Sequence, residues 1–179
     1  MDWFTLNMNK DGFKWQTDLT SVLFGETKLF NHDFKLVQID SSYPGIGLTT
    51  EDFMTAKSQL INMKMEGLYC SDILCVGSNE CSAYKGLIPD VSLTLSNRVT
   101  YEVKGDDLLL PVEGKKYQCE FLIHDSIDSY ALGSVFLKDR YSVYDMDNFK
   151  MAIGPVFDFD APVSSNDIDT DPTEKETGN

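Results

Sequence analysis

Positive charge is scarce in this sequence. The 15 Lys and Arg residues stand against 29 Asp and Glu residues, which gives a formal net charge of −14. Nucleic acids and anionic membranes would therefore gain no general electrostatic attraction to the chain. The aromatic residues also lack the interleaved Lys and Arg of an RNA-stacking surface. We expect no nucleic-acid partner, and a partner that is a neutral or basic polypeptide or a small molecule.

Long apolar runs are missing as well. No stretch approaches the roughly 18–20 uninterrupted apolar residues that a membrane span requires. The opening residues Met1-Asp2-Trp3-Phe4 show neither the basic region nor the apolar core of a signal peptide. We therefore expect no membrane partner, and we expect any targeting signal to lie upstream of this sequence.

Zinc-binding patterns are not present either. Histidine occurs only twice, and the Cys-x-x-Cys spacing of zinc ribbons is absent from the four cysteines, which are Cys70, Cys75, Cys81 and Cys119. The sequence thus predicts no metal and no cofactor. An even number of cysteines favours disulfides and an oxidising compartment, and the sequence alone allows three pairings.

What the chain does contain is a series of short strands separated by turns. Its length suits one domain with a sizeable core. Strands are predicted at residues 90–95, 99–103, 108–112 and 117–123, which indicates a mainly β domain. Asp11-Gly12 between apolar runs predicts a hairpin of residues 3–8 and 13–17, and a turn at Gly25 follows within residues 19–29.

Other patterns predict two helices, a last hairpin and a tail. The apolar spacing predicts a helix over residues 50–65 that ends at Gly67, and a short helix near residues 135–140. The last hairpin is predicted from residues 142–145 and 151–153. Residues 158–179 hold seven acids and one base, so we expect a disordered acidic tail after a domain of residues 1–157.

One acidic residue follows a predicted buried strand. Leu36-Val37-Gln38-Ile39 leads into Asp40, two serines and Tyr43-Pro44-Gly45. A carboxylate at the end of a rigid strand can meet a substrate, but the same residues also suit a turn-initiating Asp whose side chain caps Ser42. His124-Asp125-Ser126 contains the residue types of a catalytic triad, yet adjacent side chains diverge, so no triad is expected.

Three segments together carry a family resemblance. Residues 36–48, 131–145 and 148–154 resemble, in order and spacing, the C-terminal lobe of pepsin-like (cathepsin D-like) aspartic proteases. The resemblance covers residues 3–157 and is most specific from Leu132 to Asp145. It implies a single lobe of the pepsin-like acid protease β-barrel fold, with orthogonally packed sheets and one or two short helices.

The resemblance also assigns roles. Asp40 would be one aspartate of a catalytic dyad that hydrolyses peptide bonds with activated water at acidic pH. The loop around it would be supported by Ser41, Ser42, Leu132 and Gly133. The family pattern pairs Cys81 with Cys119, which leaves Cys70 with Cys75. The implied substrate is a polypeptide, and the implied location is the secretory pathway, a lysosome- or vacuole-like compartment or the extracellular space.

The sequence departs from the family pattern in two ways. Ser42 replaces the motif glycine, and Tyr43-Pro44 stands near the usual Thr/Ser, so we expect Asp40 to be displaced. No second Asp-Thr/Ser-Gly is present, so an N-terminal lobe must come from an upstream segment, a cleaved chain or another protomer. The alternatives are a catalytically inactive binding or inhibitor module, and a secreted β-domain with structural duties.

Overall fold

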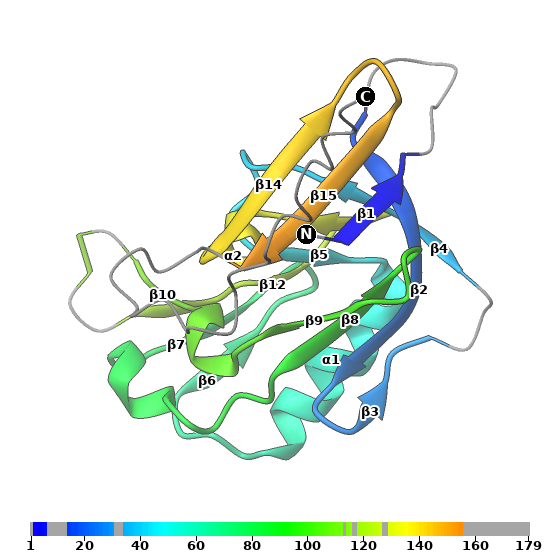
Figure 1. The fold of residues 1–179 in the computed structure, drawn as a ribbon. Helices are drawn as coiled ribbons and strands as arrows, with labels where there is room; N and C mark the ends of the chain where they lie inside the picture. Colours follow the sequence, from blue (N-terminus) through cyan, green and yellow to red (C-terminus); the bar gives the residue numbers. More distant parts are fainter. Residues whose placement is uncertain are drawn as a thin grey trace, which may run out of the picture.

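The computed structural model describes residues 2–6, 14–30, 34–112, 114–115, 118–126 and 129–155. Its fold is mainly β, as predicted, with three sheets and two α-helices (Figure 1). The expected acidic tail, the Asp11-Gly12 turn and one of the two histidines, His32, lie outside the described residues. Each sheet has a linear strand order in the described residues, so continuous pairing does not close a barrel there.

The largest sheet carries most of the core. Its order is β12-β5-β13-β4-β2-β8-β9, and β3 pairs with β2 beside this path. In chain order the strands are β2 (Gln16–Phe24), β3 (Thr27–Lys28), β4 (Lys35–Ile39), β5 (Ile46–Leu48), β8 (Val91–Leu95), β9 (Thr100–Val103), β12 (Ile123–Asp125) and β13 (Tyr130–Leu132). Val91, Leu93 and Leu95 are buried while the residues between them are not, which is the alternation of a strand with one apolar face. The predicted turn is present, because Gly25 has φ +58° between β2 and β3.

A four-stranded sheet holds both disulfides. Its strands follow the order β10-β11-β7-β6, and their bounds are β10 (Leu109–Pro111), β11 (Cys119–Phe121), β7 (Cys75–Gly77) and β6 (Leu68–Cys70). One disulfide, Cys70–Cys75, joins β6 to β7, and the other, Cys81–Cys119, ties the 3-10 helix η1 (Cys81–Tyr84) to β11. These are the two pairs that the family resemblance implies. Cys70–Cys75 closes a short loop and Cys81–Cys119 closes a long one. Both bonds stabilise a sheet whose strands are short.

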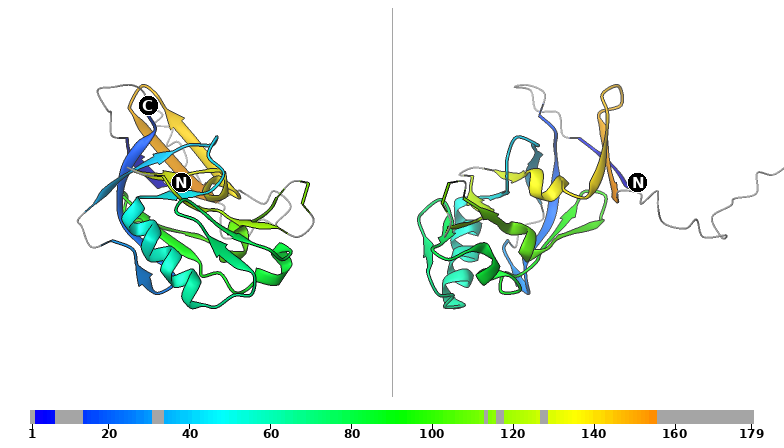
Figure 2. Two further views of the ribbon diagram at one scale, coloured as in Figure 1. Left: turned by 180° about the vertical axis from the view of Figure 1, so that it is seen from behind. Right: turned by 90° about the vertical axis from the view of Figure 1, so that its left-hand side faces the viewer.

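The third sheet contains both ends of the described chain. Its order is β1-β15-β14, with bounds β1 (Asp2–Thr5), β14 (Arg140–Asp145) and β15 (Lys150–Pro155). The β14–β15 hairpin confirms the predicted last hairpin, and Figure 2 shows it standing out from the rest of the fold. The predicted pairing of the first two strands is wrong, because β1 pairs with β15 and β2 pairs with β3, β4 and β8.

Both predicted α-helices are present with shifted bounds. Helix α1 (Thr50–Asn62) packs against β5, β6 and β12, with Phe53, Ala56 and Leu60 buried. It ends before the predicted Met65 because Lys64 already has the left-handed φ of +53°. Helix α2 (Ser134–Leu137) follows β13, and a second 3-10 helix, η2, spans Gly105–Leu108. None of the helices in the described residues has the length and apolar character needed to cross a bilayer.

Candidate functional site

Three short strands place the Asp40 loop. Strands β4 and β5 follow one another in the chain, yet β13 lies between them, parallel to β4 and antiparallel to β5. Leu132 is the register partner of both Ile39 and Ile46. The connection between β4 and β5, residues 40–45, must therefore pass over the end of β13. Leu132 and Gly133, to which the resemblance assigns a supporting role, thus lie beside the Asp40 loop.

Backbone hydrogen bonds join this loop to the residues that follow β13. The Asp40 amide donates to Leu132 O at 3.0 Å, and the Gly133 amide donates to Gly45 O at 2.9 Å. The Ser134 amide donates to Tyr43 O at 2.7 Å. A Cβ at Gly133 would lie 2.1 Å from that same carbonyl oxygen, so the close approach requires glycine at this position. The loop geometry is thus set by backbone contacts from two separate parts of the chain.

The Asp40 carboxylate receives hydrogen bonds from neutral donors. Its Oδ1 accepts from the Ser42 hydroxyl at 2.6 Å and the Ser42 amide at 2.9 Å, while Oδ2 accepts from Gln38 Nε2 at 3.2 Å. The Ser42 bonds, with a smaller effect from Gln38, stabilise the ionised form and lower the pKa of Asp40 below its usual value. Asp40 is partly exposed, so the ionised carboxylate is open to a partner or a water.

The two departures from the family pattern have different outcomes. Ser42, which replaces the motif glycine, holds Oδ1 of Asp40 through two hydrogen bonds, while the expected displacement of Asp40 stays a prediction. The interpretation of Asp40 as a turn-initiating residue that caps Ser42 is confirmed, because the Ser42 amide donates to its carboxylate. Tyr43 does not replace the usual Thr/Ser hydroxyl, because its own hydroxyl lies 3.3 Å from His124 Nδ1.

A hollow of about 450 Å³ lies beside the carboxylate. It is lined by Asp40, Ser41, Ile39, Trp15 and Tyr144. Trp15 and Tyr144 meet edge to face with ring centroids 4.6 Å apart, although they come from the start of the large sheet and from β14. The sequence did not reveal this pairing, because the two aromatic residues are 129 positions apart. An ionised carboxylate beside two aromatic side chains suits a chain with both polar backbone and apolar side chains.

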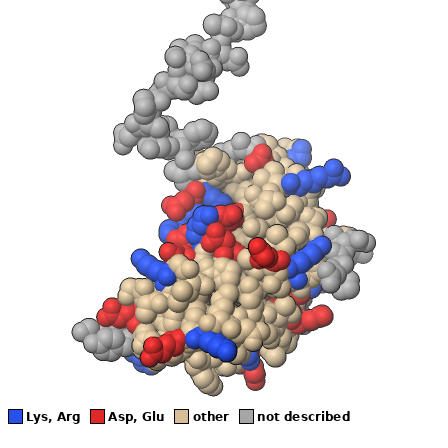
Figure 3. Space-filling view, turned by 90° about the horizontal axis from the view of Figure 1, so that it is seen from below, with Lys and Arg blue, Asp and Glu red and all other residues tan. Residues whose placement is uncertain are grey.

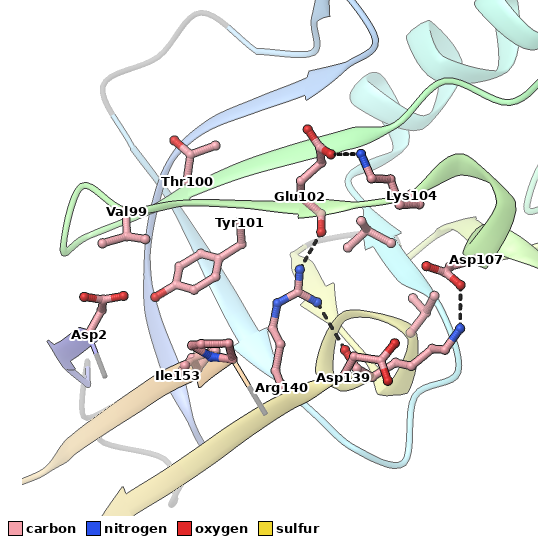
Figure 4. Close-up of a pocket in the computed structure, with 15 residues that line it drawn as sticks. Asp2, Val99, Thr100, Tyr101, Glu102, Lys104, Asp107, Asp139, Arg140 and Ile153 are labelled. Atoms are coloured by element: carbon pink, nitrogen blue, oxygen red, sulfur yellow. Dashed lines mark hydrogen bonds and ion pairs between the residues drawn. The ribbon is translucent and has the colours of Figure 1, made fainter. Parts of the chain in front are cut away.

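A second hollow, of about 460 Å³, lies between β9, β14 and the end of β15 (Figure 4). Its cations already have partners in the described residues. Lys104 pairs with Glu102 and Asp90, and Lys138 pairs with Asp107. Arg140 donates to the carbonyl oxygens of Phe136 and Glu102, and burial lowers the pKa of its guanidinium. These contacts form a charge network that holds β9 against β14.

The chemistry of the site is that of a single carboxylate. The hydrogen bonds to Asp40 in the described residues come from Ser42 and Gln38, so a shared-proton dyad would need a second acid from elsewhere. No group of three His, Cys, Asp or Glu side chains in the described parts of the chain could hold a metal ion. On the face shown in Figure 3, acidic side chains lie beside basic ones.

Comparisons with known proteins give a family match and a similar fold. Comparison with curated protein sequences gives no match. Among solved structures, the fold is similar to the crystal structure of basic 7S globulin from soybean, with a TM-score of 0.65 and 13% sequence identity. The similarity covers 86% of this chain and 41% of the soybean protein, so this chain spans less than half of that structure. The sequence model of the eukaryotic aspartyl protease family matches residues 2–156, and the chain therefore belongs to that family.

Proposed function

We propose that this chain is the C-terminal lobe of an aspartic endopeptidase and that it supplies Asp40 as one aspartate of the catalytic dyad. The observation that carries the proposal is the Asp40 carboxylate, which is partly exposed at the end of β4 and hydrogen-bonded by neutral donors. An acid held in this way keeps its charge without an ion pair. It can therefore act on a water molecule once a second carboxylate is placed beside it.

The second carboxylate would come from an N-terminal lobe, supplied by an upstream segment, a cleaved chain or another protomer. Two acids that share one proton work at acidic pH, where one is ionised and the other is protonated. The low pKa of Asp40 favours it as the ionised member, which activates the water, while the partner acid protonates the substrate carbonyl. The hollow beside Trp15 and Tyr144 would receive part of a polypeptide substrate.

The proposed location is the secretory pathway, a lysosome- or vacuole-like compartment or the extracellular space. Two disulfides support it, since such bonds persist in oxidising environments. Unfolded polypeptide substrates of an acid protease are also abundant in acidic compartments. A reduced form of the chain is expected to lose stability mainly through the Cys81–Cys119 bond, which closes the longer loop.

The experiment is an Asp40→Asn substitution in the assembly expressed from the complete coding sequence. The change is nearly isosteric and keeps one acceptor oxygen for the Ser42 bonds, so the fold should persist while cleavage of unfolded protein at acidic pH is lost. Asp72→Asn is the matched control, because that aspartate is fully exposed and lies away from the loop. Full turnover in the Asp40→Asn assembly would remove Asp40 from the mechanism.

A second candidate function is a catalytically inactive module that binds or inhibits other proteins. The observation in its favour is Tyr43, which stands near the usual Thr/Ser of the family pattern. Its hydroxyl contacts His124 and not Asp40, so it does not replace the Thr/Ser hydroxyl. The same assembly separates the two. An assembly that binds unfolded polypeptide with equal affinity before and after Asp40→Asn, and that cleaves it in neither form, would favour the binding module.

A further inference from the structure

The Tyr43 side chain connects the Asp40 loop to a partly buried histidine, His124. The Tyr43 backbone is fixed at both ends, since its amide donates to Asp40 O at 3.1 Å and its carbonyl oxygen accepts from the Ser134 amide. Its ring meets His124 edge to face, with centroids 5.9 Å apart, and its hydroxyl lies 3.3 Å from His124 Nδ1. The Tyr43 side chain thus joins the peptide units that flank Asp40 to His124.

His124 lies in an environment that contains several acids. Its side chain is 12% exposed, and its Nε2 is 3.0 Å from Glu120 Oε1 without the alignment of a hydrogen bond. Glu120 comes from β11, and Asp125, the next residue on β12, accepts from the Thr50 hydroxyl of α1 at 3.0 Å. On the other side, β5 presents Gly47 to His124. The titratable groups that face the imidazole are thus Glu120 and the Tyr43 hydroxyl, while the Asp125 carboxylate points to the other face of β12 and acts on Tyr43.

This arrangement assigns a role to each imidazole nitrogen. We place the proton of neutral His124 on Nε2, which faces the Glu120 carboxylate, so that Nδ1 accepts from the Tyr43 hydroxyl. A second proton can enter only at Nδ1. The Tyr43 oxygen then accepts from the new Nδ1–H, and the hydroxyl proton must turn to another acceptor, at a cost because the tyrosine is half-buried.

We propose that His124 is a positioning residue for the Asp40 loop: the neutral imidazole accepts from the Tyr43 hydroxyl, and protonation reverses this bond and turns the hydroxyl proton toward another acceptor. Burial lowers the pKa of His124, and the Glu120 carboxylate partly opposes that effect, so the reversal belongs to acidic pH. Because Ser42 lies between Tyr43 and Asp40 in the chain, we expect the reversal to alter the bonds that hold the carboxylate. The coupling goes beyond the proposed function, since it acts in this chain whether or not an assembly cleaves peptides.

The test is an NMR titration of the intact, disulfide-bonded chain. The sequence has two histidines, so their ring resonances are readily separated, and His32→Asn assigns them. We expect His124 to titrate below the pH at which a free histidine does. The Tyr43 ring and the Ser42 and Ser134 amides should show an inflection at that same pH, in addition to the lower inflection of Asp40.

Two variants distinguish a transmitted effect from a direct one. In Tyr43→Phe the ring stays but the hydroxyl is lost, so His124 should titrate about half a unit higher while the matching inflection at Ser42 and Ser134 disappears. In His124→Gln an acceptor remains but no charge can form, so the inflection should vanish at all three residues. Persistence of the Ser42 inflection in Tyr43→Phe overturns the proposal, and so does a His124 titration in the wild-type chain that leaves Tyr43, Ser42 and Ser134 unchanged. Either result leaves the role proposed for Asp40 intact.

Discussion

Two aspartates twelve positions apart show how burial decides what a carboxylate can do. Asp52, in the first turn of α1, is 1% exposed, and its Oδ2 accepts from Tyr130 at 2.9 Å and Thr49 at 2.6 Å and pairs with Lys35. Asp40 is partly exposed and has hydrogen bonds from Ser42 and Gln38 alone in the described residues. The buried acid is committed to an ion pair, whereas the partly exposed acid keeps its charge through hydrogen bonds from neutral donors.

One strand serves both aspartates. Tyr130 at the start of β13 donates its hydroxyl to Asp52, and Leu132 at the end of β13 accepts from the Asp40 amide. Lys35, on β4, also lies over the rings of Phe30 and Tyr130, at 5.1 and 5.5 Å from their centroids. The buried cluster thus fixes the two strands from which the Asp40 loop is built. Rigidity in one region supports an open carboxylate in the other.

The largest expected effect is on folding stability, from Asp52→Ala. The substitution leaves the Lys35 ammonium, the Tyr130 hydroxyl and the Thr49 hydroxyl without their shared acceptor. We expect the free energy of unfolding to fall by about 3 kcal/mol, because one partner of a buried ion pair is removed. Chemical denaturation of the disulfide-bonded chain measures it. Asp40→Ala is the control and should cost less than about 1 kcal/mol. An equal loss in both variants would show that burial does not separate the roles of the two aspartates.

A smaller loss of stability is expected from Gly133→Ala. The added Cβ would meet Tyr43 O at 2.1 Å and Gly45 O at 2.7 Å, and both are backbone atoms that can move only with the loop. We expect a loss of about 2 kcal/mol and altered amide resonances at Ser42. Gly86→Ala is the control, since a Cβ there meets nothing within 4 Å and only its φ of +72° opposes the change, at a cost of about 1 kcal/mol. Unchanged Ser42 resonances in Gly133→Ala would show that β13 does not set the loop.

The parts of the fold that the sequence predicts well are those with local causes. Strand alternation, the Gly25 turn and the last hairpin depend on neighbouring residues, and the structure contains all three. The strand that pairs with β1 could not be predicted from neighbouring residues, because β1 pairs with β15 near the other end of the described chain. The predicted hairpin was favoured by a strong local turn signal, but long-range pairing prevailed over it.

The candidate site divides in the same manner. Asp40 at a strand end, and Leu132 and Gly133 beside it, follow from apolar runs and the spacing of the family pattern. The contacts of Trp15 with Tyr144 and of Tyr43 with His124 join residues 129 and 81 positions apart, so no local pattern could predict them. The hydrogen bonds from Ser42 to Asp40 were not predicted either, since a motif comparison records a lost glycine but not the two bonds that serine gains.

The smallest effect, and the sharpest on Asp40 itself, is expected from Ser42→Ala. The substitution removes the hydroxyl that donates to Oδ1 and leaves the amide bond in place, so the pKa of Asp40 should rise toward its usual value without reaching it. A lowered carboxyl pKa adds stability that is present above the unfolded-state pKa and is lost as the pH falls through the folded-state value. The variant should therefore lose its acid stability at a slightly higher pH. Carbon-detected NMR of the Asp40 carboxyl measures the shift, and Ser41→Ala, which removes none of the described bonds to Asp40, is the control. If the two variants leave the same Asp40 pKa, the bonds from Ser42 do not hold the open carboxylate in its charged form.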